Sequence, residues 1–319
     1  MSSATYVLIT PARNESRFIE LTLKSVVAQT VRPLKWVIVS DDSTDGTDEI
    51  VSGYAAKHSW IELIRMPERR ERHFAGKVES FGAGYSRLSD LRYEYIASLD
   101  GDISFDVEYF SFLLQKFAED PGLGLVGTPF IESGRTYDYR FTNIEHVSGA
   151  CQVFRRQCFE EIGGYVPVKA GGIDLMAVIK ARMKGWKTRT FTEKVCVHHR
   201  EMGRAQNGPL KAIFRQGAKD YSFGNHPVWE LFRTAYQMTR RPTAIGGLAL
   251  LCGYASAFFK GAERPVSGDM VRFVRAEQMK RLGKLFAGSP FARKKPNASE
   301  SSCSLSANPV MVSQADEHK

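Results

Sequence analysis

Hydrophobic and polar positions follow two different periods in the N-terminal part of the chain. Short runs of β-branched and other apolar residues predict strands, at 6–10, 36–39, 61–64, 96–99, 123–127, 147–155, 188–191 and 195–197. Between these runs, apolar residues recur every three or four positions, which predicts amphipathic helices, at 18–29, 47–56, 80–88, 107–118 and 175–184. Strands that alternate with helices through short connections are typical of an α/β fold with a parallel sheet.

The pattern changes in the C-terminal third of the chain. Residues 215–236 predict a mixture of helix and loop, and residues 244–259 contain no charge and many small residues. The uncharged stretch is too short to span a bilayer as a simple helix, so it is either buried or lies in a membrane interface. Residues 269–286 predict a basic amphipathic helix, whereas the sequence beyond Pro290 has little to bury and is expected to be disordered.

Composition and charge fit a globular protein with an unevenly distributed positive charge. Of the 319 residues, 43% are hydrophobic and 25% are charged, and the formal net charge is +9. Between residues 260 and 295 there are ten Lys or Arg against three acids. Such a tract is typical of an anionic membrane surface, nucleic acid or a solvated helix. Because no motif that reads nucleic acid accompanies it, we expect no nucleic-acid partner.

The cysteines and the hydropathy of the N-terminus indicate the cellular compartment in which the protein is expected. The five cysteines are scattered and show no Cys-x-x-Cys or Cys/His ligand spacing, so neither a zinc site nor a disulfide framework is indicated. A reducing cytoplasm fits this pattern best. The N-terminus has no basic patch followed by a long apolar core, so we expect no signal peptide.

Two aspartates, Asp100 and Asp102, follow directly on the predicted strand 96–99 and are separated by Gly101. The glycine lets the backbone turn sharply, and open α/β sheets bind ligands beyond the carboxyl ends of their strands. Two hard oxygen ligands suit Mg²⁺ or Mn²⁺ that takes its other ligands from water and substrate phosphates. The alternative is an Asp-Gly turn without a ligand, which is common in soluble proteins.

A second acidic pair, Asp41 and Asp42, follows the predicted strand 36–39. A carboxylate here can accept a hydrogen bond from a pyrimidine base or a ribose hydroxyl. The alternative is a cluster of helix caps, since Ser43, Thr44 and Asp45 are all good capping residues. No Gly-x-Gly-x-x-Gly or Gly-x-x-x-x-Gly-Lys-Ser/Thr motif is present, so diphosphate binding is expected to rest on a metal ion and cationic side chains.

The order of these motifs resembles the family 2 glycosyltransferases, over roughly residues 6–200. The matching segments are Pro11-Ala12-Arg13-Asn14-Glu15, Asp41-Asp42-Ser43, Asp45-Gly46-Thr47, Asp100-Gly101-Asp102, Ser148-Gly149-Ala150, Gly163-Gly164-Tyr165, Asp174 at a helix start and His198 at a strand end. The resemblance implies a GT-A type fold, in which a Rossmann-like, mostly parallel central sheet has helices on both faces. A helical C-terminal extension is expected to follow it.

The resemblance also implies roles for individual residues. Those expected at the nucleotide sugar are Pro11, Glu15, Asp41, Asp42, Lys77, Asp100 and Asp102. Among them, Asp42 is expected to read a uracil-like base and Asp100 to face the ribose. Asp102 is expected to bind the metal, with His198 (or its neighbour His199) near the diphosphate. Asp174 matches the general base that deprotonates the acceptor hydroxyl.

Two departures from the family pattern refine these expectations. Ile173 stands where the family usually has a glutamate before the base, so Asp174 is the one carboxylate there, and its alternative role is a helix cap. The Gln-x-x-Arg-Trp signature of processive polysaccharide synthases is absent after His199. We therefore expect an inverting enzyme that moves a single sugar from a nucleotide-diphosphate sugar to a glycan or lipid-linked glycan, in cell-surface or exopolysaccharide biosynthesis.

Two other functions fit parts of the sequence. A sugar-activating nucleotidyltransferase also has a nucleotide-binding α/β domain and acidic metal ligands, but its Gly-rich, Lys-containing N-terminal loop is not evident here. A non-catalytic scaffold that docks to membrane through the basic C-terminal segment is the other alternative. The intact acidic residues at every motif argue against a protein that has lost catalysis.

The sequence predicts three segments. Residues 1–205 are expected to form the catalytic domain, with a nucleotide-sugar half at 1–102 and an acceptor half at 103–205. Residues 206–288 form the helical extension and residues 289–319 the disordered tail. Segment 244–286 is expected to hold the enzyme peripherally on the cytoplasmic face of a membrane. The alternative is that this segment folds against the catalytic domain.

Overall fold

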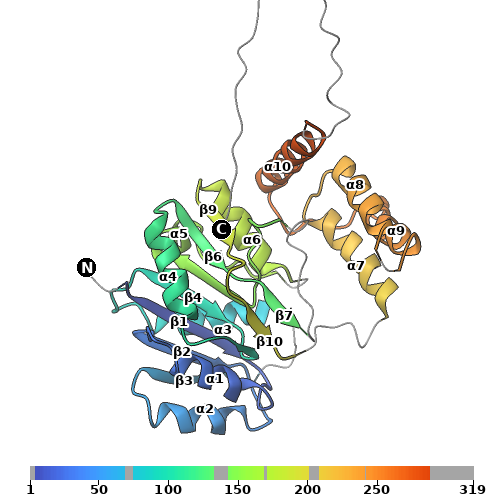
Figure 1. The fold of residues 1–319 in the computed structure, drawn as a ribbon. Helices are drawn as coiled ribbons and strands as arrows, with labels where there is room; N and C mark the ends of the chain where they lie inside the picture. Colours follow the sequence, from blue (N-terminus) through green and yellow to red (C-terminus); the bar gives the residue numbers. More distant parts are fainter. Residues whose placement is uncertain are drawn as a thin grey trace, which may run out of the picture.

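The structure is a computed structural model that describes residues 4–68, 75–132, 143–168, 171–200, 208–240 and 242–287 (Figure 1). The predicted disordered tail from residue 289 lies outside these residues. In the described part of the chain, a central sheet with helices on both faces is followed by a group of four helices beside it.

A seven-stranded, mostly parallel sheet forms the centre of the catalytic part, with the strand order β3-β2-β1-β4-β8-β6-β9. Its strands are β1 (Tyr6–Ala12), β2 (Lys35–Ser40), β3 (Ile61–Arg65), β4 (Tyr95–Leu99), β6 (Leu123–Gly127), β8 (Cys151–Arg155) and β9 (Lys187–Thr190). Only β8 runs antiparallel to its neighbours, β4 and β6. The predicted α/β fold is confirmed, although the strand predicted at 147–155 begins only at Cys151.

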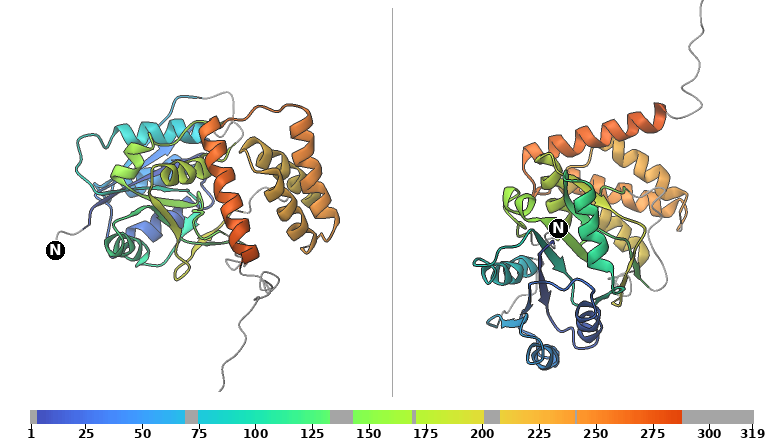
Figure 2. Two further views of the ribbon diagram at one scale, coloured as in Figure 1. Left: turned by 90° about the horizontal axis from the view of Figure 1, so that it is seen from above. Right: turned by 60° about the vertical axis from the view of Figure 1, so that its left-hand side comes forward.

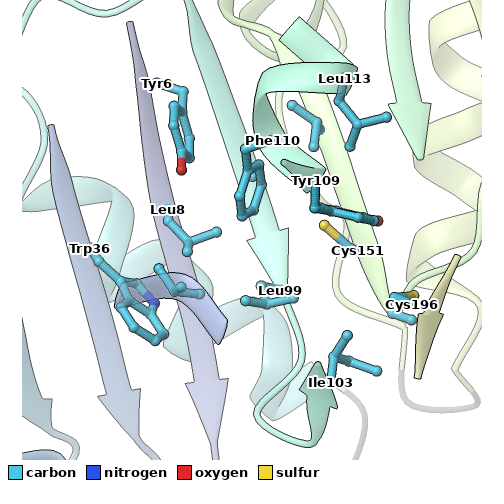
Figure 3. Close-up of a cluster of buried hydrophobic side chains, with 14 of the residues drawn as sticks. Tyr6, Leu8, Trp36, Leu99, Ile103, Tyr109, Phe110, Leu113, Cys151 and Cys196 are labelled. Carbon is cyan, nitrogen blue, oxygen red and sulfur yellow. The ribbon is translucent and has the colours of Figure 1, made fainter. Parts of the chain in front are cut away.

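Side chains alternate between two cores because successive residues of a strand point to opposite faces. Tyr6 and Leu8 of β1 pack under α1 (Ile19–Val27), α2 (Thr47–Ala55) and α4 (Tyr109–Glu119) (Figure 3). Val7 and Ile9 pack on the other face, under α3 (Ala75–Ser86), α5 (Arg156–Glu161) and α6 (Ile173–Met183). Both faces of the central strands are therefore buried, which explains why the strands are continuous apolar runs.

A second, three-stranded sheet lies at the carboxyl edge of the first and was not predicted. It consists of β5 (Ile103–Ser104), β10 (Cys196–His198) and β7 (Phe130–Glu132), with β10 in the middle. His198 pairs with Ile103, one residue after Asp102. This small sheet brings two motifs that are almost one hundred residues apart in sequence to the same place.

Several helix boundaries differ from the predictions. α3 begins at Ala75 rather than near residue 80, so Lys77 lies in its first turn. The stretch predicted as mixed helix and loop is two regular helices, α7 (Pro209–Ser222) and α8 (Pro227–Met238). Each begins with proline at its first helical position, where the missing N–H costs nothing.

Close contact between α7 and α9 (Ile245–Phe259) organises the helical extension. A Cβ atom on Gly253 would lie 1.9 Å from the carbonyl oxygen of Phe214, and one on Gly217 would lie 1.9 Å from that of Leu250. The missing side chains therefore allow the two backbones to touch. The hydroxyl of Tyr254 also donates a 2.8 Å hydrogen bond to the carbonyl oxygen of Asn225, which fixes α9 against the turn between α7 and α8.

The last described helix, α10 (Gly268–Ala287), returns to the catalytic part and packs on α6. Its buried residues Met270, Val271 and Val274 share a core with Ile173 and other α6 residues. An ion pair of 2.9 Å between Arg182 and Glu277 joins the same two helices. For α10, the alternative in which the segment folds against the catalytic domain is therefore correct. Across the described residues, no helix combines the length and the apolar character needed to cross a bilayer.

Candidate active site

The predicted metal-binding turn lies at the carboxyl end of β4 and is held by α1. Thr22 Oγ1 donates a 2.9 Å hydrogen bond to the carbonyl oxygen of Gly101 and accepts one of 3.1 Å from the N–H of Ile103. A Cβ atom on Gly101 would lie 3.1 Å from Ile19 and 3.3 Å from the Glu15 side chain. The turn between Asp100 and Asp102 is therefore fixed by packing, and glycine fits it because little space remains.

Acidic and basic side chains alternate around this turn. Lys77 pairs with Asp100, and Arg200 pairs with Glu15. The Arg200 Nε atom also lies 3.5 Å from Asp102 Oδ2. The structure thus brings together four of the residues predicted at the nucleotide sugar, but sequence reasoning gave no role to Arg200. Its signal was its position two residues after His198, where a cation on the same strand end would face the same edge.

Burial of the acids raises their affinity for protons. Burial and the nearby Asp102 raise the pKa of Glu15 to about 7, although Arg200 opposes this. Burial and the nearby Asp100 likewise raise the pKa of Asp102. Partial burial lowers the pKa of Lys77, but Asp100, Asp174 and Asp102 outweigh it and raise the pKa overall. A further positive charge at this cluster would therefore be favourable.

Of the two histidines predicted near the diphosphate, His198 faces the metal-binding turn. Its Nε2 atom lies 3.6 Å from Asp102 Oδ2, close enough for one cation to contact both, since the ligand distance of Mg²⁺ is about 2.1 Å. His199 instead lies 2.7 Å from Ser104 Oγ through its Nε2 atom. A set of three His, Cys, Asp or Glu side chains that could hold an ion is not found among the described residues. The residues present therefore fit an ion that takes its remaining ligands from water and substrate, as Mg²⁺ does.

The second acidic pair lies at the ends of β1 and β2. Arg13 contacts both members, at 3.4 Å from Asp41 and 3.9 Å from Asp42. Pro11 lies in β1 and pairs with Val39 of β2. The predicted base-binding residues Pro11, Asp41 and Asp42 are therefore neighbours at this edge of the sheet.

The helix α2 that follows has Gly46 as its N-cap, and its first N–H group bonds to Asp45 rather than to the acidic pair. Asp45 accepts hydrogen bonds from the backbone N–H groups of Ser16, at 3.0 Å, and Thr47, at 3.1 Å. Burial opposes the charge, but hydrogen bonds from the side chains and backbones of Thr47 and Ser16 lower the pKa of Asp45 to about 2. Thr47 Oγ1 also accepts a 2.8 Å bond from the N–H of Glu15. The two loops are therefore tied together through Asp45 and Thr47, although none of the residues proposed as caps is the N-cap of α2.

Asp174 lies at the start of α6 but does not cap it. The N-cap is Gly172, whose φ angle of 88° favours glycine. A Cβ atom on Gly149 would lie 3.1 Å from Asp174 Oδ2, so this carboxylate packs against the backbone of the loop before β8, where a larger residue would crowd it. Gln152 Nε2 donates a 3.3 Å bond to the carbonyl oxygen of Asp174. Because β8 is antiparallel, its first residues lie at the same sheet edge as Asp100 and Asp102.

A cavity of about 580 Å³ lies between the catalytic part and the extension. Leu175, the residue after Asp174, lines it together with His146. On the other side, α8 and α10 contribute aromatic and planar polar side chains, among them Trp229, Tyr236 and Glu277. Sequence reasoning missed this cavity because its walls come from segments that only the tertiary fold brings together.

Comparisons with known proteins agree with this geometry. The model of the family described as "Glycosyl transferase family 2" matches residues 7–171, which is more than half of the chain. The poly-beta-1,6-N-acetyl-D-glucosamine synthase of Staphylococcus aureus (strain COL) is 28% identical over 188 residues, which are 58% of this chain and 42% of that protein. The chain thus spans less than half the length of the curated relatives that it matches.

Solved structures of glycosyltransferases share the fold. The mannosyltransferase PcManGT from Pyrobaculum calidifontis, in complex with GDP-Man and Mn²⁺, aligns with a TM-score of 0.52 at 20% identity, covering 92% of this chain and 83% of that one. S. aureus TarS 1–349 in complex with UDP-GlcNAc aligns with a TM-score of 0.52 at 15% identity, covering 90% and 82%. At this identity the likeness shows the fold alone, which is of the GT-A type. The chain therefore belongs to glycosyl transferase family 2, as its sequence motifs predicted.

Proposed function

We propose that this protein moves one sugar from a nucleotide-diphosphate sugar to an acceptor hydroxyl, with inversion at the anomeric carbon. The observation that supports this best is the grouping of Asp102, Lys77 and Arg200 around one turn, with Asp174 close enough for its charge to act on Lys77. Acids for a metal ion and cations for a diphosphate stand on the donor side. A single carboxylate stands on the acceptor side.

The donor side is proposed to stabilise the departing diphosphate. Asp102 and His198 would hold Mg²⁺ or Mn²⁺, which when bound neutralises charge that develops on the leaving group. Lys77 and Arg200 would contact phosphate oxygens, and their present pairs with Asp100 and Glu15 keep them oriented before the donor arrives. Asp41, Asp42 and Pro11 would contact the base, and Asp100 the ribose.

The acceptor side is proposed to supply the proton acceptor. The Asp174 carboxylate would take the proton of the attacking hydroxyl as the new glycosidic bond forms, which strengthens the nucleophile. Attack from the side opposite to the diphosphate inverts the anomeric centre. A second carboxylate that forms a covalent intermediate, as retaining hydrolases use, is not required.

The cavity lined by Leu175, the residue after Asp174, is the proposed binding place of a glycan acceptor. Its aromatic side chains Trp229 and Tyr236 can stack on sugar rings, and Glu277 can accept hydrogen bonds from hydroxyls. The relative from S. aureus is named as a poly-beta-1,6-N-acetyl-D-glucosamine synthase, which supports a role in polysaccharide biosynthesis. Absence of the processive signature supports addition of one sugar to a glycan or lipid-linked glycan.

We also propose a cytoplasmic location, on the membrane face where lipid-linked acceptors are accessible. Free thiols support a reducing compartment: Cys151, Cys158 and Cys196 are buried and unpaired, and Cys252 is exposed and unpaired.

Nucleotide release with a panel of donors tests the proposed activity. The purified chain is incubated with UDP- and GDP-sugars, Mn²⁺ and an oligosaccharide acceptor, and nucleoside diphosphate is measured. Release that depends on acceptor and is lost in Asp174→Asn supports transfer. Exchange of pyrophosphate with a nucleoside triphosphate would favour the nucleotidyltransferase instead. Absence of either reaction, with intact donor binding, would favour the scaffold.

A further inference from the structure

A buried glutamine connects three segments around the proposed acceptor side. Gln152 lies in β8 and is fully buried. Its Nε2 atom donates hydrogen bonds to the carbonyl oxygens of Val147, at 3.1 Å, and of Asp174, at 3.3 Å. Its Oε1 atom accepts a 2.7 Å hydrogen bond from the hydroxyl of Tyr165. A glutamine amide has two N–H donors, so both of them are used here.

The partners of the amide determine its orientation. The carbonyl oxygens of Val147 and Asp174 can only accept hydrogen bonds, so the NH₂ group of Gln152 has to face them. The Oε1 atom then faces Tyr165, whose hydroxyl has to donate. A reversed amide would place Oε1 against two other acceptors and lose both of those bonds. The Tyr165 hydroxyl and the two carbonyl groups therefore hold the amide in one orientation.

Packing of aromatic rings fixes the place of the Tyr165 hydroxyl. The Tyr165 ring makes edge contacts with Phe81 of α3, Phe154 of β8 and Phe159 of α5, at 4.9, 5.8 and 5.9 Å between ring centroids. Residues of α3, α5 and α6 share the core on this face of the central sheet (Figures 1 and 2). The hydroxyl that orients Gln152 is thus carried by a ring that is held on several sides.

The turn before Tyr165 explains a motif to which the sequence resemblance assigned no role. In Gly163-Gly164-Tyr165, the two glycines have φ angles of 67° and 66°, which favour glycine. The N–H of Gly164 donates a 3.0 Å hydrogen bond to the carbonyl oxygen of Phe159, which closes the end of α5. The motif therefore ends this helix and places one hydroxyl group on Gln152.

Asp174 is the partner of the amide with a proposed chemical role. Its carbonyl group lies in the first turn of α6, and its carboxylate packs against the loop before β8 at Gly149. Val147, which receives the other N–H of Gln152, belongs to the same loop. A single amide therefore holds both the helix that carries Asp174 and the loop against which its carboxylate packs.

The strand that carries the amide is also joined to the donor side. Gln152 pairs with Ser98 of β4, the strand that ends at the metal-binding turn. The N–H of Asp100 in this turn donates a 3.0 Å hydrogen bond to the carbonyl oxygen of Ala150. The paired strands β4 and β8 therefore link the donor turn to the amide that holds Asp174.

We propose that Gln152 and Tyr165 are positioning residues for sugar transfer, which hold Asp174 at a fixed place relative to the donor turn. The inference rests on the proposed role of Asp174 as proton acceptor and deepens it. A proton acceptor has to lie within hydrogen-bond reach of the hydroxyl that it activates, and a misplacement of about 1 Å can slow a reaction about 10²-fold. The alternative is that the amide only satisfies buried carbonyl groups and contributes to stability.

Substitution of Gln152 has a matched control on the other face of the sheet. Gln152→Met removes the amide and keeps the length of the side chain. Gln29 is also buried, and its amide donates to the carbonyl oxygens of Ser25 and Asp106 and accepts from the N–H of Phe110. Gln29→Met therefore removes the same number of hydrogen bonds without a contact to Asp174.

Substitution of Tyr165 has a control as well. Tyr165→Phe removes only the hydroxyl and keeps the ring in its aromatic surroundings. The hydroxyl of Tyr6 donates a 2.9 Å hydrogen bond to the carbonyl oxygen of Val31. Tyr6 is the first residue of β1, whereas the proposed site lies at the carboxyl ends of the strands. Tyr6→Phe therefore removes a comparable bond far from the site.

Steady-state transfer and donor titrations compare these variants, with Mn²⁺, an oligosaccharide acceptor and the UDP- or GDP-sugar that the donor panel selects. We expect Gln152→Met to lower kcat by about 10- to 100-fold and Tyr165→Phe to lower it severalfold. The dissociation constant of the donor and the KM for the acceptor should stay close to those of the parent. Gln29→Met and Tyr6→Phe should lower the melting temperature by a similar amount but keep the kcat of the parent.

The Asp174→Asn background separates positioning from a purely structural role. Gln152→Met should have little further effect on the rate once the carboxylate is gone, because both changes remove the same contribution. A general loss of folded protein would lower the rate by the same factor in both backgrounds. Circular dichroism confirms the fold of each variant, and if Gln152→Met does not fold, Tyr165→Phe in the same two backgrounds decides.

Three results would overturn the proposal. These are a parent-like kcat in the Gln152 and Tyr165 variants, an equal loss of kcat in their controls, and an equal factor with and without the Asp174 carboxylate. In each of these cases the proposed transfer reaction still holds, provided that Asp174→Asn alone is slow. Transfer by Asp174→Asn at the rate of the parent would instead remove the proposed proton acceptor, and this inference with it.

Discussion

Asp102 lies at the centre of the proposed donor site, between His198 and Arg200. It is buried, it lies near His198 and Arg200, and it follows a turn that Thr22 fixes through two hydrogen bonds. A carboxylate in this position has little freedom to move. Its loss should therefore change the electrostatics of the site more than the fold.

For Asp102→Asn we expect loss of Mn²⁺-dependent nucleotide-sugar binding and of turnover, because an amide is a poorer ligand for a hard cation than a carboxylate. The pair between Arg200 and Glu15 remains, so the melting temperature should change little. Calorimetric titration of the donor, with and without Mn²⁺, measures the effect. Equal donor affinity in both proteins would remove Asp102 from the metal site.

Asp174→Asn should separate chemistry from binding. Transfer should slow by about 10²–10⁴-fold, the usual contribution of a positioned proton acceptor, while the dissociation constant of the donor stays close to that of the parent. Single-turnover rates and donor titrations provide the two values. A parallel loss of donor affinity would identify Asp174 as a donor-site or structural residue.

At the scale of single elements, glycine decides how closely α7 and α9 approach. Gly217 and Gly253 occupy the crossing point, where a methyl group would meet backbone atoms that cannot rotate away. Gly283 of α10 is also in a helix interior, but a Cβ atom there would have no neighbour within 4 Å. Gly253 and Gly283 are therefore the same residue type in a crowded and in an open helix interior.

Gly253→Ala should lower the free energy of unfolding by about 1–3 kcal/mol, the usual cost of overpacking. Gly283→Ala should raise it by up to about 1 kcal/mol, because alanine restricts the unfolded chain and favours helix. Urea unfolding of both variants tests the pair. Equal effects would mean that α7 and α9 are not in backbone contact.

The buried acids of the extension predict a dependence of stability on pH. Burial and the nearby Asp220 raise the pKa of Glu230 to about 7, against the opposing effect of Arg233. An unfolded-chain glutamate has a pKa of about 4.3. The folded protein therefore binds this proton more tightly, and the resulting stabilisation is present below about pH 4.3 and lost as the pH rises through 7.

We expect Glu230→Gln to flatten this dependence. Between pH 5 and 8 the melting temperature of the parent should fall more than that of the variant, because glutamine cannot lose a proton. Glu263→Gln changes an exposed glutamate of the same extension and serves as the control. Identical curves for the parent and Glu230→Gln would show that Glu230 does not titrate in this range.

At the scale of the whole molecule, the catalytic part and the extension together line the cavity that contains Leu175, Trp229 and Tyr236. Trp229→Ala should raise the KM for a glycan acceptor severalfold and leave donor affinity unchanged, because Trp229 lines this cavity and none of the residues proposed to bind the donor does. Met279→Ala, an exposed change on α10, is the control. Unchanged acceptor kinetics in Trp229→Ala would place the acceptor elsewhere.

The pattern of neighbouring residues was enough to predict the strands and the acidic residues at their ends. Apolar runs located the strands of the sheet, and the acidic residues at strand ends located Asp100, Asp102 and Asp41. The antiparallel direction of β8 was not accessible, because strand direction depends on connections rather than on the residues from Cys151 onward. The two- and three-residue strands β5 and β7 are too short to show a period.

Contacts between residues that lie far apart in sequence could not be predicted either. Arg200 pairs with Glu15 across 185 positions of sequence, and the residues around each of them give no indication of this pair. The apolar side of α10 has the spacing of an interfacial helix, so the sequence alone could not tell a membrane from α6 as its partner. In both cases the tertiary fold supplied the information.

The return of α10 to α6 has a consequence for the order in which the protein is made. Ribosomes deliver the N-terminal part first, and domains begin to fold as they emerge. The sheet and α6 are complete long before Val266, Met270 and Val274 exist to cover Ile173 and Met176. Until then the helix that presents Asp174 has a bare apolar side. The growing chain is therefore most exposed to aggregation late in synthesis, and the packing around α6 is the last part of the described fold to form.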